Sequence, residues 1–308
     1  MNAIAEAPAI DQKAVGIYHK FNVERTDGSS APGGKHEGDE YFVLNLTTDK
    51  HALPALAAYA KSCANDYPVL AADLRTKCQS LQKDEFAQVP ETTLPNGHVE
   101  PAFLVGKYLS GRGDAGQLVV NAEAAPWVEI DYHAARAAAE AAGYKLITET
   151  QYLALAYNIA NVAANWSSGI VGEGSLQQGL RNDSVDEAQP GTFISNDEDE
   201  TRVFTLSNGE TVYDVAGNAY SWVFDNVQGD ENGLIAKSFA ADSPSITTAP
   251  APSMQKGVGW YPSAGSDWSG HALVRGGYWD SGDYAGVFRL GGGHPGCVND
   301  GVGFRCTK

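Results

Sequence analysis

Residues 275–290 read RGGYWDSGDYAGVFRL, and the chain closes shortly afterwards on Gly303-Phe304-Arg305-Cys306. Large apolar residues, Trp279, Val287 and Phe288, alternate here with small polar residues. Large apolar side chains are usually buried and small polar ones usually exposed. The stretch therefore predicts a buried apolar frame that presents polar side chains on one outer face.

Three segments upstream carry local structural signals. In PWVEIDYHAA (126–135), Asp131 can cap a helix over 132–142, which Gly143 would end in the left-handed conformation. In GYKLITETQY (143–152), the Thr-x-x-Gln pattern predicts a capping box at the start of a second helix. Residues 213–225 read YDVAGNAYSWVFD. After about residue 165 helical periodicity disappears, which predicts a loop-rich half with short strands.

Taken in order, these four segments resemble the formylglycine-generating-enzyme (sulfatase-modifying factor) family, a branch of the C-type-lectin fold. Residues 143–152 look like its "G-x-R-L-P-T-E-A-E-W" segment, with Ile147 in place of Pro. Residues 213–225 look like "Y-D-M-x-G-N-V-W-E-W", and the C-terminal stretch looks like "R-G-G-S-W … G-F-R-C". The resemblance implies an α+β, loop-rich C-type-lectin fold with short strands and two helices over residues 101–308.

The cysteines that the enzymatic members use do not have counterparts here. Residues 282–290 contain no cysteine, Cys297 has no partner at short spacing, and Cys306 takes a packing position of the family motif. The related iron oxidases need a cluster of histidines, and no known metal spacing joins the histidines of residues 101–308. We therefore expect no enzymatic activity, no catalytic residue and no metal site. An oxidase is the third and least favoured alternative.

A different branch matches better, the variable proteins of diversity-generating retroelements. Their C-terminal region resembles "R-G-G-S-W-x-x-G-x-x-A-G-V-F-x-L … G-F-R-C", which makes 275–306 a candidate variable region. The resemblance implies ligand binding by Tyr278, Asp280, Ser281, Asp283, Tyr284, Gly291, Gly293, His294, Gly296, Cys297, Asn299 and Asp300. Every one of these residue types can be reached from an AAC codon by changing its two adenines, and none is Lys, Glu, Gln or Met.

The function expected is a ligand- or receptor-binding protein of a phage or prophage, with a host-surface protein or glycan as its ligand. A rigid scaffold lets surface side chains vary without refolding, and Tyr, Ser, Gly and Asp serve there as they do in antibody loops. The alternative left open is a non-diversified virion structural protein, a head decoration or tail fibre subunit, that uses the same fold.

The first part of the chain has a different pattern. We expect a small β-β-α-α module over residues 1–85, with strands at 16–24 and 41–46 followed by two helices, and a linker over 86–100. The module resembles a small domain of bacteriophage proteins. That resemblance implies attachment to other virion proteins. Homo-oligomerisation is also expected, because multivalent display strengthens weak binding. The resemblance to phage proteins of this type implies a trimer.

Composition limits the remaining possibilities. The chain has 308 residues and a net charge of −17, so it should repel phosphate, and nucleic-acid binding is not expected. No apolar run of about 18 residues is present, so no membrane insertion is expected. We expect no signal peptide, synthesis in a host cytoplasm and a place on the virion surface. No cofactor is expected. Structural calcium at the acidic residues 196–200 is left open, although a solvated turn is favoured.

Overall fold

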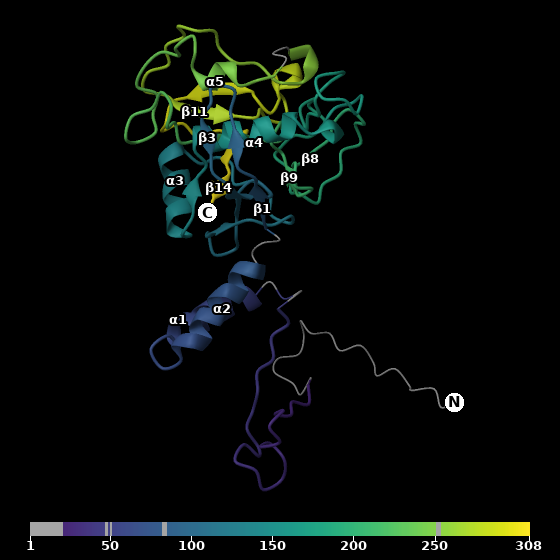
Figure 1. The fold of residues 1–308 in the computed structure, drawn as a ribbon, viewed down its shortest axis with the longest axis vertical. Coiled ribbons are helices and arrows are strands. Elements are labelled where there is room, and N and C mark those ends of the chain that lie inside the picture. Colours follow the sequence, from purple (N-terminus) through teal and green to yellow (C-terminus); the bar gives the residue numbers. More distant parts are fainter. Residues whose placement is uncertain (1–20, 47–48, 50, 82–84, 251–253) are drawn as a thin grey trace, which may run out of the picture. The chain divides into compact units, whose positions relative to one another are not determined.

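The computed structural model describes residues 21–46, 49, 51–81, 85–250 and 254–308, and the chain divides into two compact units, Met1–Leu81 and Gln82–Lys308. The described residues form a mixed α+β structure with many short strands in open sheets (Figure 1). None of the helices in this described part is long and apolar enough to span a membrane.

The N-terminal unit contains a helical hairpin. Helices α1 (Ala52–Ser62) and α2 (Pro68–Leu81) lie side by side, as predicted (Figure 1). The predicted strands at 16–24 and 41–46 were wrong for their described parts, because residues 21–24 and 41–46 have no strand structure. These segments contain residue types that favour strands, but no described strand pairs with them. A strand forms only when another backbone supplies its hydrogen bonds. Residues 16–20 lie outside the described residues.

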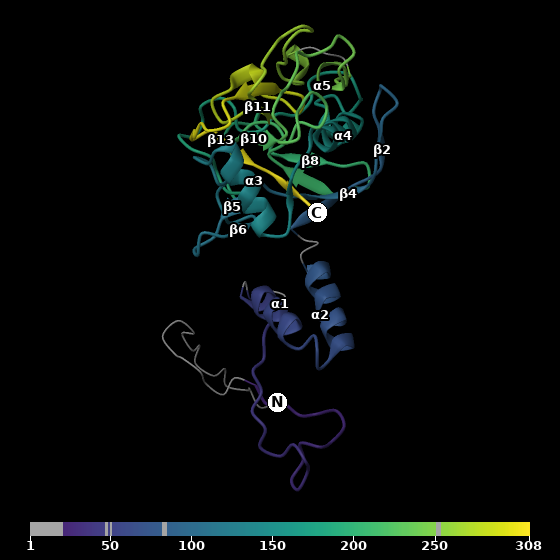
Figure 2. The same ribbon diagram turned by 90° about the vertical axis from the view of Figure 1, so that its left-hand side faces the viewer.

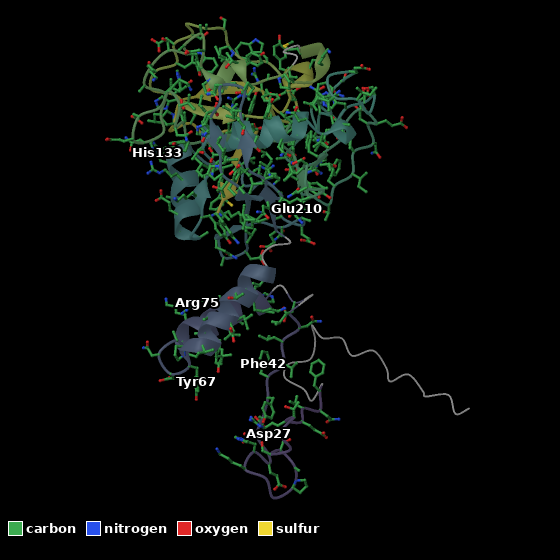
Figure 3. The ribbon with its side chains drawn as sticks, in the orientation of Figure 1. Asp27, Phe42, Tyr67, Arg75, His133 and Glu210 are labelled. Carbon is green, nitrogen blue, oxygen red and sulfur yellow. The ribbon has the colours of Figure 1, made fainter. Side chains whose placement is uncertain are left out.

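The segment predicted to be a linker is instead part of the C-terminal unit. Strand β1 (Phe86–Val89) pairs with β4 (Phe103–Gly106), and β2 (Thr92–Thr93) forms a hairpin with β3 (Val99–Glu100). The reason is the apolar content of β1, whose Phe86, Ala87 and Val89 are fully buried. The boundary between the units therefore falls near residue 82. Glu210, labelled in Figure 3, accepts a hydrogen bond from the Gln88 amide of β1 at 2.9 Å.

Strands from both ends of the unit meet in one sheet. Its order is β1-β4-β14-β7, with β14 at Cys306–Thr307 and β7 at Lys145–Leu146. Helix α3 (Tyr132–Ala141) packs its small-residue face on this region, and Figure 2 shows it alongside β14. The predicted cap is present, since the Asp131 carboxylate accepts the Ala134 amide at 2.8 Å.

Helix α4 (Glu149–Ala160) is almost entirely buried in the main core. It begins with the predicted capping box. The Gln151 amide donates to the Thr148 hydroxyl, and the Gln151 side chain accepts from the Thr148 amide at 3.1 Å. The capping box satisfies backbone donors at a half-buried helix end.

The second sheet carries the C-terminal stretch. Its order is β12 (Leu290–Gly293), β11 (Ala272–Arg275), β10 (Tyr220–Val223) and β13 (Val302–Phe304), with β10 and β13 parallel. The remaining elements are short: β5 (Gly111–Arg112), β6 (Leu118–Val119), η2 (Ala163–Asn165), β8 (Val203–Thr205), β9 (Thr211–Tyr213), α5 (Pro244–Thr247), η3 (Met254–Lys256) and η4 (Gly282–Tyr284).

Buried arginines connect the loops. Arg275 pairs with the Glu149 carboxylate at the start of α4, with no exposure of either side chain, and also donates to the Phe288 carbonyl at 2.9 Å. Arg305 donates to the carbonyls of Gly106, Tyr213 and Asp214. In a structure with little regular hydrogen bonding, these guanidinium groups fix the loops in place of strand pairing.

Candidate ligand-binding face

The floor of the candidate site is one face of the β12-β11-β10-β13 sheet. Gly293 lies over Trp222, and Gly291 lies over Val274. A Cβ added at Gly293 would come within 2.9 Å of the Trp222 ring, and one added at Gly291 within 2.9 Å of Val274 Cγ2. Because glycine leaves this space open, a depression of about 360 Å³ forms over the sheet. We call it the Tyr278 depression.

Part of the predicted ligand-binding set gathers at this depression. Its walls include the predicted residues Tyr278, Gly291, Gly293, His294, Cys297 and Asn299. Most of the predicted residues are exposed, namely Asp280, Asp283, Tyr284, His294, Gly296, Cys297, Asn299 and Asp300. Tyr278 and Gly293 are half-buried. Most of the set is therefore exposed, as predicted, while its role in binding stays a prediction.

Two members of the predicted set are buried. Ser281 accepts the Tyr278 amide at 2.9 Å through its hydroxyl, and its own amide donates to the Tyr278 carbonyl at 3.1 Å. The prediction that Ser281 is exposed was wrong, because its side chain closes a turn. Gly291 is also buried, and it forms part of the floor without reaching the outer surface.

The apolar frame lies beneath this face. Val287, Phe288 and Phe304 are buried, as predicted. Trp279, predicted to be buried, is half-buried and packs on a small cluster around Leu109. It remains partly exposed because that cluster is too small to cover the indole.

Tyr278 forms an aromatic wall of the depression. Its ring stacks on that of Tyr220, with centroids 5.6 Å apart and an angle of 23° between the rings. Burial raises the pKa of Tyr278, and the nearby negative charges of Asp280 and Asp300 raise it further. The Tyr278 hydroxyl therefore stays protonated near neutral pH, beside groups that carry negative charge.

Arg289 was not among the predicted binding residues, yet it lines the Tyr278 depression and a second depression. Its guanidinium lies 4.7 Å from the centroid of Trp260 and 5.8 Å from those of Tyr220 and Tyr284. A signal for this residue was present in the sequence. Arg289 occupies the position x of "A-G-V-F-x-L", which the motif leaves unspecified. An arginine codon can also be reached from AAC by changing only its adenines.

The second depression, of about 320 Å³, has walls from outside the candidate variable region. Trp260, Trp268 and His271 line it together with Arg289. Backbone hydrogen bonds hold Trp260 against the variable region, from its amide to the Tyr284 carbonyl at 3.1 Å and from the Leu290 amide to its carbonyl at 2.9 Å. We call it the Trp260 depression. The sequence did not predict this wall, because Trp260 is distant in the chain from residues 284–290 and only the fold brings them together.

Acidic residues in the 196–200 segment are used within their own loop. Glu200 accepts the amides of Arg181 and Asn182 and the hydroxyls of Ser184 and Ser195, at 2.6–2.9 Å. Glu200 is buried, so its part of the segment is not the solvated turn that the sequence favoured. Within the described ranges, no three His, Cys, Asp or Glu side chains group in a way that could hold a metal ion.

Cys297 and Cys306 differ in their exposure to solvent. Cys306 is fully buried, and burial raises the pKa of its thiol to about 11, whereas Cys297 is exposed. The buried thiol therefore remains protonated near neutral pH, and it is a poor nucleophile in that state.

Comparisons with known proteins give structural neighbours only, since no family model and no curated protein matches the chain. PvdO from Pseudomonas aeruginosa is 14% identical with a TM-score of 0.34, and the match covers 72% of this chain and 91% of PvdO. Treponema denticola variable protein 1 is 14% identical with a TM-score of 0.36, covering 72% and 93%. The Major Tropism Determinant U1 variant is 16% identical with a TM-score of 0.35, covering 72% and 54%.

The structural neighbours include a variable protein and Major Tropism Determinant variants.

Proposed function

We propose that this chain is a ligand- or receptor-binding protein of a phage or prophage, with a diversified face on a C-type-lectin-like scaffold. One observation carries the proposal: polar residues at the open positions of the frame are mostly exposed, while Val287, Phe288 and Phe304 are buried beneath them. A surface built this way can change its side chains while the core stays the same. It acts by binding and not by catalysis, in keeping with the absence of cysteine from residues 282–290.

The DNA beside the gene tests diversification. We expect a reverse-transcriptase gene and a near-identical repeat of the codons for 275–306, differing from the gene at template adenines. The differences should fall on exposed positions such as Asp283, Tyr284 and His294 and spare Val287 and Phe288. Absence of both the gene and the repeat would favour the non-diversified virion structural protein.

We also propose that the N-terminal unit assembles the protein and attaches it to the virion, where the binding face would be displayed. Large apolar side chains are exposed on the described residues of this unit. Phe42 is 81% exposed and Tyr67 61%, and both are labelled in Figure 3. Apolar surface of this kind is typical of an interface. Light scattering of the purified chain should give the mass of a trimer, and a monomer at micromolar concentration would contradict this.

A further inference from the structure

Arg289 is a cation without an anionic partner within the part of the chain that the structure describes. Its Nε donates to the Tyr220 hydroxyl at 3.1 Å, and one terminal nitrogen donates to the Trp260 carbonyl at 3.4 Å. No salt bridge joins Arg289 to a described carboxylate, although the chain has a net charge of −17. The N–H groups of the other terminal nitrogen have no partner among the described residues.

The surroundings of this guanidinium are aromatic and hold it in place. It lies 4.7 Å from the centroid of Trp260 and 5.8 Å from the centroids of Tyr220 and Tyr284. Removal of water by aromatic rings strengthens the attraction between a cation and a bound anion. The planar guanidinium suits a carboxylate, whose two oxygens can accept from two parallel N–H groups.

Charge decides between the two depressions that Arg289 lines. The negative charges of Asp280 and Asp300 act on the Tyr278 hydroxyl, so the rim of the Tyr278 depression repels an anion. Neither depression has a carboxylate in its own lining, so the difference in charge comes from Asp280 and Asp300 near Tyr278. The lining of the Trp260 depression consists of Trp260, Trp268, His271, Arg289 and two glycines. An anionic group should therefore bind on the Trp260 side.

The shape and lining of the Trp260 depression indicate the remainder of the ligand. The rings of Trp260 and Trp268 are nearly parallel, at 24° with centroids 6.4 Å apart, and they give flat apolar walls. The volume of about 320 Å³ is at the lower limit for a small-molecule site, so a single sugar-sized ring fits it. His271 supplies a polar side chain for a hydroxyl group.

We propose that the Trp260 depression binds an acidic sugar, with Arg289 holding the carboxylate and the two indoles packing against the ring. The inference rests on the proposed function and adds a ligand class to it. It also gives position 289 a particular role. A change at this open position of the frame would alter the charge preference of the site while the walls of Trp260 and Trp268 stay the same.

The first test compares matched ligands on the full chain. Glucuronic acid and N-acetylneuraminic acid are titrated against the methyl ester of glucuronic acid and against glucose, with indole resonances observed by NMR. We expect shifts at Trp260 and Trp268 with the acids and at least about tenfold weaker binding of the ester, because esterification removes the charge. Equal binding of acid and ester would overturn the proposal.

The second test uses variants. Arg289→Gln should weaken binding of the acids at least about tenfold. Arg289→Lys should bind the acids better than Arg289→Gln, since lysine keeps the positive charge but lacks the two parallel N–H groups of the guanidinium. Arg136→Gln is the matched control, because Arg136 is also half-buried beside an aromatic ring but lies on α3. An equal loss in the control, or no loss in Arg289→Gln with an unchanged melting temperature, would overturn the proposal.

The outcomes separate this inference from the proposed function. If a polyglutamate peptide binds through Arg289 and the acidic sugars do not, the sugar assignment is wrong and the ligand is a protein. If the sugars fail but a template repeat lies beside the gene, only this inference fails. If the acids bind through Arg289 and no repeat is found, the diversified receptor-binding function fails and the acidic-sugar site is retained.

Discussion

The two units of this chain differ in what they do with their large side chains. In the C-terminal unit even charged groups are fully buried, as with Arg275 and Glu149, and large aromatic residues fill the core. In the described part of the N-terminal unit the buried residues are small, chiefly Ala and Cys, while Val69 and Phe42 are 75% and 81% exposed. A short helical hairpin with so little buried area is not expected to be stable alone. The difference is the physical reason for our proposal that the N-terminal unit assembles with partners, whereas the C-terminal unit has a large core of its own.

The largest expected effect comes from breaking the buried ion pair. Glu149→Ala should lower the free energy of unfolding by about 3–5 kcal/mol, because it leaves Arg275 charged and unpaired inside the core. Glu140→Ala, which removes an exposed pair with Arg136 on α3, should cost less than about 1 kcal/mol. Urea denaturation of both variants measures the contrast. Similar losses would mean that the core of the C-terminal unit tolerates an unpaired charge.

A smaller contrast lies within the binding face. Phe288→Ala should cost about 3 kcal/mol because it opens a cavity in the main core. Tyr284→Ala, at a side chain 52% exposed, should change stability by no more than about 0.5 kcal/mol. Thermal melts of the two variants compare the stability lost at a buried frame residue with that lost at an exposed residue of the face. A large loss of stability for Tyr284→Ala would show that this exposed side chain contributes to the core.

The loop held by Glu200 should respond to pH. Burial acts to raise the pKa of Glu200, but hydrogen bonds from the Arg181 amide, from Ser195 and Ser184, and from the Asn182 amide outweigh it, so the pKa lies below its ordinary value of 4.5. A lowered pKa in the folded state means that this stabilisation is complete above about pH 4.5 and is lost as the pH falls through the folded value.

Melting curves between pH 3 and 7 check this dependence. Glu200→Gln should be destabilised by about 2 kcal/mol at pH 7, since its amide group meets donors where the carboxylate accepted them. The difference from the unmodified protein should shrink on acidification. A difference that stays constant down to pH 3 would show that the charge of Glu200 does not support the loop.

The smallest effect on stability is expected in the N-terminal unit. Tyr67→Ser and Val69→Ser together should change the unfolding of the C-terminal unit by less than about 0.5 kcal/mol, because the two side chains are exposed. The same double variant should lower the mass of the assembly in light scattering. If the mass is unchanged, these two residues are not in the interface. The exposed apolar side chains of the N-terminal unit would then not be explained by assembly.

Much of the scaffold followed from local sequence. The Asp131 cap, the Thr148–Gln151 capping box and helices α1 to α4 depend on neighbouring residues, so their patterns were sufficient. The alternation in 275–290 likewise separated buried Val287 and Phe288 from exposed Tyr284. Each of these features is set by hydrogen bonds or periodicity within about one turn of the chain.

Other features depended on contacts between distant segments. Strand β1 forms because β4 pairs with it, and residues 41–46 stay irregular because no described strand pairs with them. Ser281 is buried by a turn, and Arg289 gains its role from Trp260 and Tyr220. The residue types were visible in the sequence. Their pairing required the tertiary structure, because strand partners and site walls are set by which distant segments pack together.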